Sequence, residues 1–480
     1  MEDNAMDRTV ILDKPKNIGA IIGNGPDEWQ ILQRQADGSA KIHLSGTWTS
    51  GEPLAVLLVK ARIVLEDTGE TIVPWSPAEM GNDQAWKVSM TIPEGGLYRI
   101  ETCLSSEEQP AVEWSTRGDM IHHIGVGDVF VIAGQSNAAG YGKDPVSDPP
   151  EIGIHLLAND LRWHLATHPF NESTGTAHPV NRENANPGHS PWLAFAKRLR
   201  RNTGVPVGLI QTSLGGSPLS AWNPEEEGSL YRNMLEVLDT LHMDSSDRRI
   251  RGVLWYQGCS DASEEASGTY LERFSSFVSH LRADLGDPDL PFLTVQIGRY
   301  VADENPGGDI GWATVREAQR QAARILSGVV VIPALDLPLS DAIHISSAGN
   351  MVLGERAAKA VLGAFFGSGD GYLAPEPMAA VRTMGNTVKI CFDYVSERLY
   401  GYELSPELSP FLVEQAGGTL LTPRSIAYSE KNEVTLVFDG DIGPGCHLHG
   451  AYRKNAYPVL PIDVSSRLPM LSFCGFQIEG

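Results

Sequence analysis

No apolar run in the 480 residues approaches the roughly 18 consecutive positions that a membrane-spanning helix requires. Basic residues are also scarce, since 37 Lys and Arg face 60 Asp and Glu and give a net charge of −23. A surface this acidic repels phosphate backbones and anionic lipids, so nucleic acid and membranes are not expected partners. The oligomeric state stays open.

Cysteine is sparse as well. The five cysteines stand singly and cannot all pair, which fits a reducing compartment; they lie at positions 103, 259, 391, 446 and 474. The first ten residues, MEDNAMDRTV, lack the basic start and the apolar stretch of a secretory signal. We therefore expect a cytoplasmic protein, or a secreted one if a leader has been removed from the chain.

Apolar residues make up 42% of the chain, enough for a sizeable core, and the length suggests about three domains. Residues 1–124 alternate short β-type runs with Gly and Pro turns, which predicts an N-terminal β-sandwich-like domain. A Gly- and Pro-rich linker lies at 367–377. Strand-like runs return after it, so residues 369–480 are predicted to form a C-terminal β-rich domain.

The middle segment, residues 125–368, has a different pattern. Short apolar, β-branched runs alternate with amphipathic helical segments, which is typical of a parallel sheet covered on both faces. The five runs lie at 129–133, 205–210, 252–256, 292–295 and 329–332. The predicted fold class is therefore α/β, with a five-stranded parallel sheet flanked by two β modules.

Residues suited to acyl transfer follow the first and last of these runs, and ligands bind at the carboxyl ends of strands in an open parallel sheet. Ser136 stands among small residues at a strand-to-helix turn, as a nucleophile or as a helix-capping serine. Asp341 and His344 are three positions apart, so one turn can bring the carboxylate beside the imidazole. A capping Asp and a surface His are the alternative.

Further candidates follow the second and third runs. Gly215 and Gly216 could present N–H groups to an oxyanion or form an ordinary turn, and Gln257 offers a side-chain amide. Cys259 is interpreted as a packed thiol, because no basic residue adjoins it to lower its pKa. Trp222 could stack on a sugar ring or belong to the core.

A long insert, roughly residues 145–191, lies between the first two apolar runs and is rich in histidine. We expect it to be either a substrate-shaping lid or an elaborated surface loop with satisfied histidines. Its histidines lack the carboxylate or cysteine spacing of a zinc site, and Cys446-His-Leu-His449 has no second ligand pair nearby. The prediction is therefore no metal site and no cofactor.

Two serine-hydrolase architectures fit a nucleophile of this kind. The α/β-hydrolase elbow is Gly-x-Ser-x-Gly, with the acid and the base normally on separate loops. Here Ala138 replaces the final glycine, and Asp341 and His344 share one turn. Both features favour the other architecture.

That other architecture is the SGNH hydrolase, and the chain resembles its sialate O-acetylesterase-like branch, to which carbohydrate esterase family 6 is related. Four blocks carry the resemblance in family order: Gly134-Gln-Ser-Asn137, Leu214-Gly-Gly-Ser217, Trp255-Tyr-Gln-Gly258 and Asp341-x-x-His344. The resemblance implies a flavodoxin-like sheet and a catalytic set of Ser136, Asp341 and His344. It also implies oxyanion or substrate contacts from Gln135, Gly215, Gly216 and Gln257.

The implied function is a serine esterase that removes O-acetyl groups from a carbohydrate, either sialic acid or a plant or bacterial polysaccharide, through an acetyl-enzyme. One departure is Cys259, where the family has Glu after Gln-Gly; Asp261 could substitute for that acid. The departure leaves open a non-catalytic carbohydrate-binding protein, and an esterase for lipid-like or aryl esters is the other alternative. Sialic acid would need a cation, for which Arg299 and Lys143 are candidates.

Overall fold

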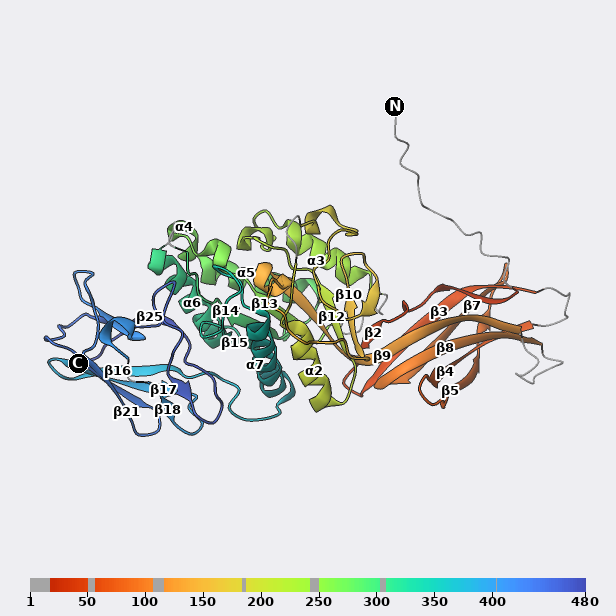
Figure 1. Cartoon of the computed structure of the whole chain (residues 1–480). Coiled ribbons are helices and arrows are strands. Elements are labelled where there is room, and N and C mark those ends of the chain that lie inside the picture. The colour runs from red at the N-terminus through yellow and green to blue at the C-terminus, as the bar shows by residue number, and fades with distance from the viewer. Residues whose placement is uncertain are drawn as a thin grey trace, which may run out of the picture. The chain divides into compact units, whose positions relative to one another are not determined.

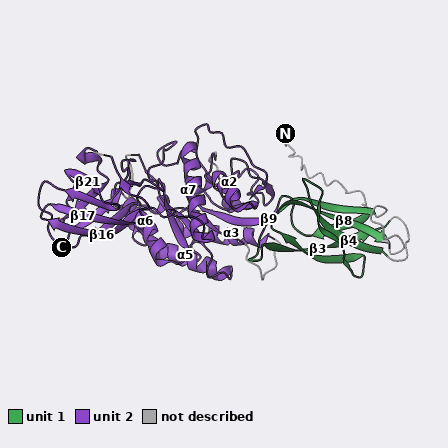
Figure 2. Ribbon diagram, turned by 90° about the horizontal axis from the view of Figure 1, so that it is seen from below, with its two compact units in different colours: residues 1–29, 34–126, 242–244 green, residues 30–33, 127–241, 245–480 purple. Residues whose placement is uncertain are grey.

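A computed structural model describes residues 18–50, 57–106, 116–183, 187–241, 250–302, 308–402 and 404–480. These residues fall into two compact units, coloured separately in Figure 2. Unit 1 holds residues 18–29 and 34–126 of the described ranges, and unit 2 holds residues 30–33 and those from 127 onward. Within these ranges, no helix is long and apolar enough to cross a membrane.

Unit 1 consists of antiparallel sheets, as the alternating runs of its sequence predict. In β3 (Ser39–Thr49), Ala40, Ile42 and Leu44 are buried while the residues between them face solvent. One sheet has the order β1 (Gly19–Asn24), β3, β7 (Ala85–Pro93) and β6 (Glu79–Met80). The other joins β5 (Thr71–Pro77), β4 (Leu57–Leu65), β8 (Gly95–Ser106) and the first part of β9 (Thr116–Gly134).

A parallel sheet dominates unit 2 (Figure 1). The five predicted runs form the second part of β9, β12 (Val207–Gln211), β13 (Gly252–Tyr256), β14 (Phe292–Gln296) and β15 (Val329–Pro333). Their order, β12-β9-β13-β14-β15, is that of a flavodoxin-like doubly wound sheet. Residues of the last four strands are all buried, which explains why these runs are mostly apolar.

The count of five strands was not confirmed, because the 145–191 insert extends the sheet. Strand β10 (Ile154–Leu157) pairs in parallel with β12, and β11 (Trp163–Leu165) closes that edge in the antiparallel direction. The short β2 (Ile31–Gln33) also pairs with β9. Three apolar residues and a histidine inside a polar insert are too short a run to be identified as a strand from periodicity alone.

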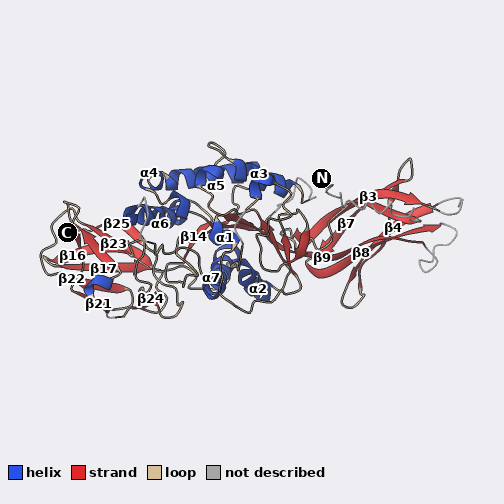
Figure 3. Cartoon of the chain, turned by 45° about the horizontal axis from the view of Figure 1, so that its top comes forward, coloured by secondary structure: helices blue, strands red, loops and turns tan. Residues whose placement is uncertain are grey.

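Helices cover both faces of the parallel sheet (Figure 3). Helices α2 (Trp192–Thr203) and α7 (Ser347–Phe366) pack together on one face, and α3 (Ser229–Asp239), α5 (Tyr270–Asp284) and α6 (Gly308–Ile325) lie on the other. Shorter helical segments are α1 (Ser136–Ala139), α4 (Glu264–Ser267), and 3-10 turns at Pro179–Asn181, Leu219–Ala221, Cys259–Asp261 and Pro406–Leu408.

The C-terminal strands belong to the same compact unit as the parallel sheet, so a separate domain that begins at residue 369 stays a prediction. One sheet has the order β16 (Glu376–Met384), β17 (Thr387–Asp393), β22 (Glu433–Val437) and β21 (Ser425–Ser429). Another has β20 (Leu420–Leu421), β19 (Phe411–Glu414), β23 (His447–Gly450) and β25 (Phe473–Gln477). Strands β18 (Leu399–Tyr400) and β24 (Ile462–Asp463) form a small pair. Together they enclose an apolar core that includes Ile390, Phe411 and Leu436.

Candidate active site

Ser136 is the first residue of α1, directly after the central strand β9. The turn requires glycine at position 134, where φ is +124° and a Cβ would lie 2.3 Å from the Tyr256 carbonyl oxygen. The strand therefore ends close against β13, and the chain turns sharply enough to present Ser136 at the carboxyl edge of the sheet. Ser136 is 6% exposed.

His344 and Asp341 lie beside this serine, although more than 200 positions separate them from it in the sequence. The Oγ of Ser136 is 2.9 Å from His344 Nε2, and His344 Nδ1 is 2.7 Å from Asp341 Oδ2. Because the carboxylate accepts the Nδ1 proton, Nε2 is left to accept the proton of the serine hydroxyl. The three predicted residues thus form the hydrogen-bonded chain that serine hydrolases use.

Asp341 is held in its ionised form. Partial burial acts to raise its pKa, but hydrogen bonds from the His344 ring and from the backbone N–H groups of Ile343 and His344 outweigh burial, so the pKa lies below its usual range. The charged carboxylate favours the imidazolium that forms when His344 takes a proton.

Asn137 holds the histidine loop against the serine turn. Its Oδ1 accepts a hydrogen bond from Ile345 N at 3.0 Å, and its Nδ2 donates to Ile343 O at 3.2 Å, so the amide brackets His344 on both sides. A second brace comes from Asp144, which accepts hydrogen bonds from Ser340 Oγ and Ser347 N. Sequence reasoning missed both braces. Asn137 stood inside a recognised block, but nothing in the sequence paired Asp144 with residues nearly 200 positions away.

Tyr141 supports the imidazole from the side. Its ring stacks on the His344 ring with centroids 4.8 Å apart, and its hydroxyl donates to the carboxylate of Glu183. Glu183 comes from the 145–191 insert and also accepts a hydrogen bond from Asn171 Nδ2. Burial and the neighbouring Glu183 raise the pKa of Tyr141, so its hydroxyl remains a donor. The insert is therefore tied to the triad through one tyrosine.

We expect Tyr141→Ala to lower kcat by roughly 10- to 100-fold, because the imidazole loses the ring that fixes its orientation. Tyr141→Phe keeps the ring and loses only the hydroxyl, so its kcat should stay within about threefold of wild type. Steady-state hydrolysis of an aryl acetate measures both. Equal losses in the two variants would show that the hydroxyl bond to Glu183, and not the stacked ring, carries the effect.

The two candidate oxyanion glycines differ in their surroundings. Gly215 is half-buried, and a Cβ there would collide with a Glu183 carboxylate oxygen, so any side chain would displace that carboxylate. Gly216 is exposed, with φ +67°, and a Cβ added there would meet no heavy atom within 4 Å among the described residues. Gly216 therefore faces the more open space.

Gln257 and Trp222 are corrections to the predicted binding set. The amide of Gln257 is fully buried, and its Nε2 donates to Ser217 O and to Asp261 Oδ2, so it is not presented to an oxyanion. Trp222 is also fully buried, with its indole N–H donated to Ser217 Oγ, which leaves no ring face for a sugar. Both residues brace the glycine turn from behind.

Gln135 likewise serves the backbone, since its Oε1 accepts from Gly258 N at 3.0 Å and from Ser260 N at 3.3 Å. Asp261 does not substitute for the missing acid. Its carboxylate binds Leu219 N, Gln257 and Arg273, and in the described part of the chain it makes no bond to His344. Burial raises the pKa of Cys259 to about 12, so its thiol is protonated and is a poor nucleophile.

One cluster among the described residues has ligand atoms close enough for a metal ion: Asp148, His168 and His189, within 4.8 Å of one another. The hydrogen bonds favour an ion-pair network instead. The ammonium of Lys197 lies 2.5 Å from Asp148 Oδ1. His168 Nδ1 accepts from Ser190 N, so in the neutral ring Nε2 carries the proton and donates to Asp148.

This network makes stability depend on pH. Burial lowers the pKa of His168, so the folded protein favours the neutral ring. As pH falls below the ordinary histidine pKa of about 6.5, the unfolded chain takes the proton first, and stability falls by up to ~1.4 kcal/mol per pH unit. We expect His168→Gln to flatten the slope of unfolding free energy below about pH 6.5. His164→Gln, at a half-exposed histidine of the same insert, should keep the wild-type slope. Parallel slopes for both variants would contradict the assignment to His168.

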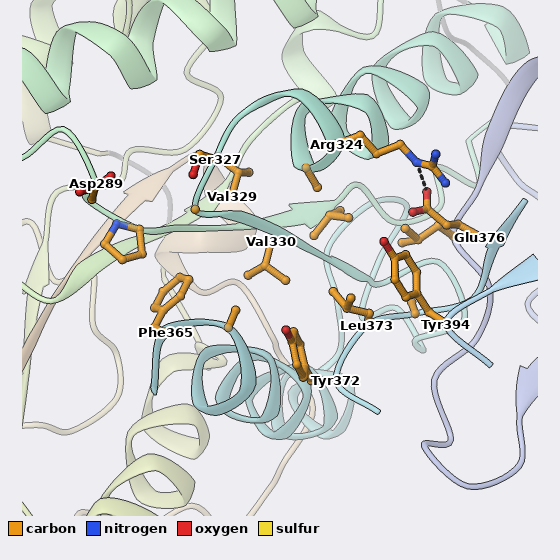
Figure 4. Close-up of a pocket in the computed structure, with 17 residues that line it drawn as sticks. Asp289, Arg324, Ser327, Val329, Val330, Phe365, Tyr372, Leu373, Glu376 and Tyr394 are labelled. Carbon is orange, nitrogen blue, oxygen red and sulfur yellow. Dashed lines mark hydrogen bonds and ion pairs between the residues drawn. The ribbon is translucent and has the colours of Figure 1, made fainter. Parts of the chain in front are cut away.

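Two pockets lie apart from the triad. A cavity of about 680 Å³ borders β15 and the ends of α6 and α7, with the Arg324–Glu376 ion pair at one end (Figure 4). None of the predicted catalytic residues lines it. Arg299 lines a second cavity of about 370 Å³. The other candidate cation, Lys143, lies nearer the triad, with its Nζ 5.1 Å from the centre of the Tyr141 ring.

The sheet order and the Ser–His–Asp chain define an α/β protein with the side-chain arrangement of a serine hydrolase. Residues 126–363 match the family described as "Carbohydrate esterase, sialic acid-specific acetylesterase".

Individual relatives agree with the family match. The chain is 21% identical to the sialate O-acetylesterases of Homo sapiens and Pongo abelii over 301 residues, which are 52% of this chain and 50% of theirs. It thus spans about half the length of these curated relatives. Among solved structures, a carbohydrate acetylesterase from Xanthomonas citri superimposes with a TM-score of 0.66 at 21% identity, covering 94% of this chain and 98% of that one. That likeness supports the fold.

Proposed function

We propose that the protein is a serine esterase that removes O-acetyl groups from a carbohydrate through an acetyl-enzyme. The observation that carries the proposal is the continuous hydrogen-bonded chain from Ser136 Oγ through His344 to Asp341. It lies inside the segment that matches the acetylesterase family.

In the first step, Ser136 Oγ attacks the acetyl carbonyl carbon while His344 Nε2 takes the hydroxyl proton. The carbonyl oxygen becomes an oxyanion, for which the donors are the Ser136 N–H and a backbone N–H of the Gly215–Gly216 turn. The C–O bond to the sugar then breaks, and His344 returns its proton to the sugar oxygen. Asp341 stabilises the imidazolium throughout.

In the second step, His344 takes a proton from water, and the resulting hydroxide attacks the acetyl group on Ser136. Collapse of the second tetrahedral intermediate releases acetate and restores the serine hydroxyl with the proton held by His344. The two steps together consume one water molecule and release the sugar alcohol and acetate.

The test is acetate release from a panel that contains 9-O-acetyl sialic acid, acetylated xylan and a simple aryl acetate. Release from a sugar supports the proposal and identifies the acetylated unit. Preference for long-chain or aryl esters over every sugar would favour an esterase of another substrate class.

A non-catalytic carbohydrate-binding protein is the second candidate, favoured by Cys259 at the position of the family Glu. The half-buried, protonated thiol of Cys259 supplies no carboxylate there. Sugar binding without acetate release from any member of the panel would support this candidate and overturn the esterase.

A further inference from the structure

The cavity of about 370 Å³ lies where the loop after β14 meets the C-terminal β module. We call it the Arg299 pocket. Its polar lining comes from both sides: Arg299 from the loop, and Glu407, Ser409, Tyr452, Arg453, Asn455 and Tyr457 from the module, so two arginines and one carboxylate border it. Ser136, Asp341 and His344 do not line it. The pocket is therefore distinct from the place where an acetyl group would react.

Two arginines of this pocket have no carboxylate partner in the described part of the chain, although the protein carries a net charge of −23. Arg299 is half-buried, donates through Nη2 to Leu337 O at 3.3 Å, and has a buried Nε with no hydrogen-bond partner among the described residues. The neighbouring Asp336 is already taken by Arg356, at 2.6 Å and 2.7 Å. A half-buried guanidinium that lines a pocket and has no ion-pair partner among the described residues favours an anionic ligand.

The walls of the pocket are fixed by a third arginine. Arg316 in α6 is fully buried and donates to backbone carbonyls on both sides. On the β14 side its acceptors are Ile297 and Gly298, and on the module side they are Ala451, Arg453 and Lys454. One buried cation thus holds Arg299 and Arg453 at the same opening.

The same loop reaches the predicted catalytic turn. Val301 N donates to Ala342 O at 2.9 Å, and Ala342 lies between Asp341 and His344 in the sequence. Tyr300 N donates to Lys454 O on the other side. Short backbone links therefore connect the pocket, through one loop, to the segment that carries the base.

We propose that the Arg299 pocket binds the carboxylate of an acidic sugar unit in the oligosaccharide whose acetylated unit reacts at Ser136. The planar guanidinium of an arginine can donate two parallel hydrogen bonds to the two oxygens of a carboxylate. Tyr452 and Tyr457 offer ring faces on which a sugar can stack. Because the pocket is separate from the triad, the substrate has at least two units. This inference rests on the proposed esterase function, and it gives the C-terminal module a role in choosing the substrate.

The test compares acetylated oligosaccharides that carry a free carboxylate with the same compounds as methyl esters. One pair contains a uronic acid and the other a sialic acid, so the panel distinguishes the two sources of the carboxylate. Variants are Arg453→Gln, at an exposed position where folding is not at risk, and Arg299→Gln. We expect kcat/KM for the free acid relative to its methyl ester to fall by about 10- to 100-fold in each, mainly through KM. Arg424→Met, at an exposed arginine elsewhere in the module, should keep the wild-type ratio.

Binding to Ser136→Ala, measured by calorimetry, separates the pocket from the chemistry. Carboxylate-dependent binding that Arg453→Gln weakens supports the pocket, even if no acetate is released and the esterase proposal fails. An unchanged acid-to-ester ratio in both arginine variants would overturn the pocket, even if Ser136-dependent acetate release upholds the esterase. Equal losses for the acid and its methyl ester would also overturn the charge-based assignment.

Discussion

Replacing Ser136 by alanine is expected to lower kcat for acetate release by on the order of 10⁴- to 10⁶-fold while the protein stays folded. The serine oxygen is the only atom of the chain that would form a bond to the substrate in the proposed mechanism. Its hydrogen bond to His344 contributes little to folding, since exchange of such a bond with water is worth about 1 kcal/mol. The midpoint of thermal unfolding should therefore change by only a few degrees.

The measurement is acetate release under saturating substrate, with thermal unfolding run in parallel. Ser279→Ala, at an exposed serine of α5 whose hydroxyl donates to Ser275 O in its own helix, is the matched control and should retain wild-type kcat. Activity of Ser136→Ala within tenfold of wild type would remove Ser136 from its role as the nucleophile.

Arg316→Met is expected to have the largest effect on stability, a loss of about 3–5 kcal/mol in the free energy of unfolding. The guanidinium is fully buried and is the shared donor for five backbone carbonyls. Burial lowers the pKa of Arg316 to about 10, so it is still charged near neutral pH. Methionine fills much of the volume but donates no hydrogen bond, so all five carbonyls lose the guanidinium; those of Ala451, Arg453 and Lys454 each keep one other donor, from Ser472, Ala456 and Tyr300.

Urea unfolding followed by fluorescence measures this loss, with Arg424→Met as the control. Arg424 is 63% exposed and lies 3.8 Å from Asp439, so its replacement should change stability by less than about 0.5 kcal/mol. Equal stability of the two variants would mean that water replaces Arg316 at the carbonyls. Loss of the acid-to-ester preference without loss of stability would instead show that Arg316 acts only by positioning Arg453.

The parts of the fold that the sequence predicts are those with strong local signals. Runs of β-branched residues such as 329–332 are fully buried strands, and the three-residue spacing of Asp341 and His344 fits within one turn. The small residues around Ser136 mark a backbone turn that only glycine at 134 allows. These signals depend on neighbouring positions, so they can be read without knowledge of the tertiary structure.

The failures have a different cause. Gln257 and Trp222 stand at the end of a strand and in a glycine turn, as binding residues do, but their side chains point into the core. Burial of this kind is decided by tertiary packing and not by the local sequence. Likewise, Ile154–Leu157 becomes a strand only because β12 offers it an edge to pair with.

The amide bracket of Asn137 also has a consequence for the order of folding. It joins segments 208 positions apart, one next to the central strand and one beyond the last. Closing so long a loop lowers the chain entropy, and only the contacts of the assembled sheet offset that loss. We therefore expect this contact to form late in folding. During synthesis on a ribosome, the turn that carries Ser136 is made about 200 residues before His344. The Ser136–His344 contact can therefore form only after the segment around residue 345 has been made, and until then the Ser136 hydroxyl has no imidazole beside it.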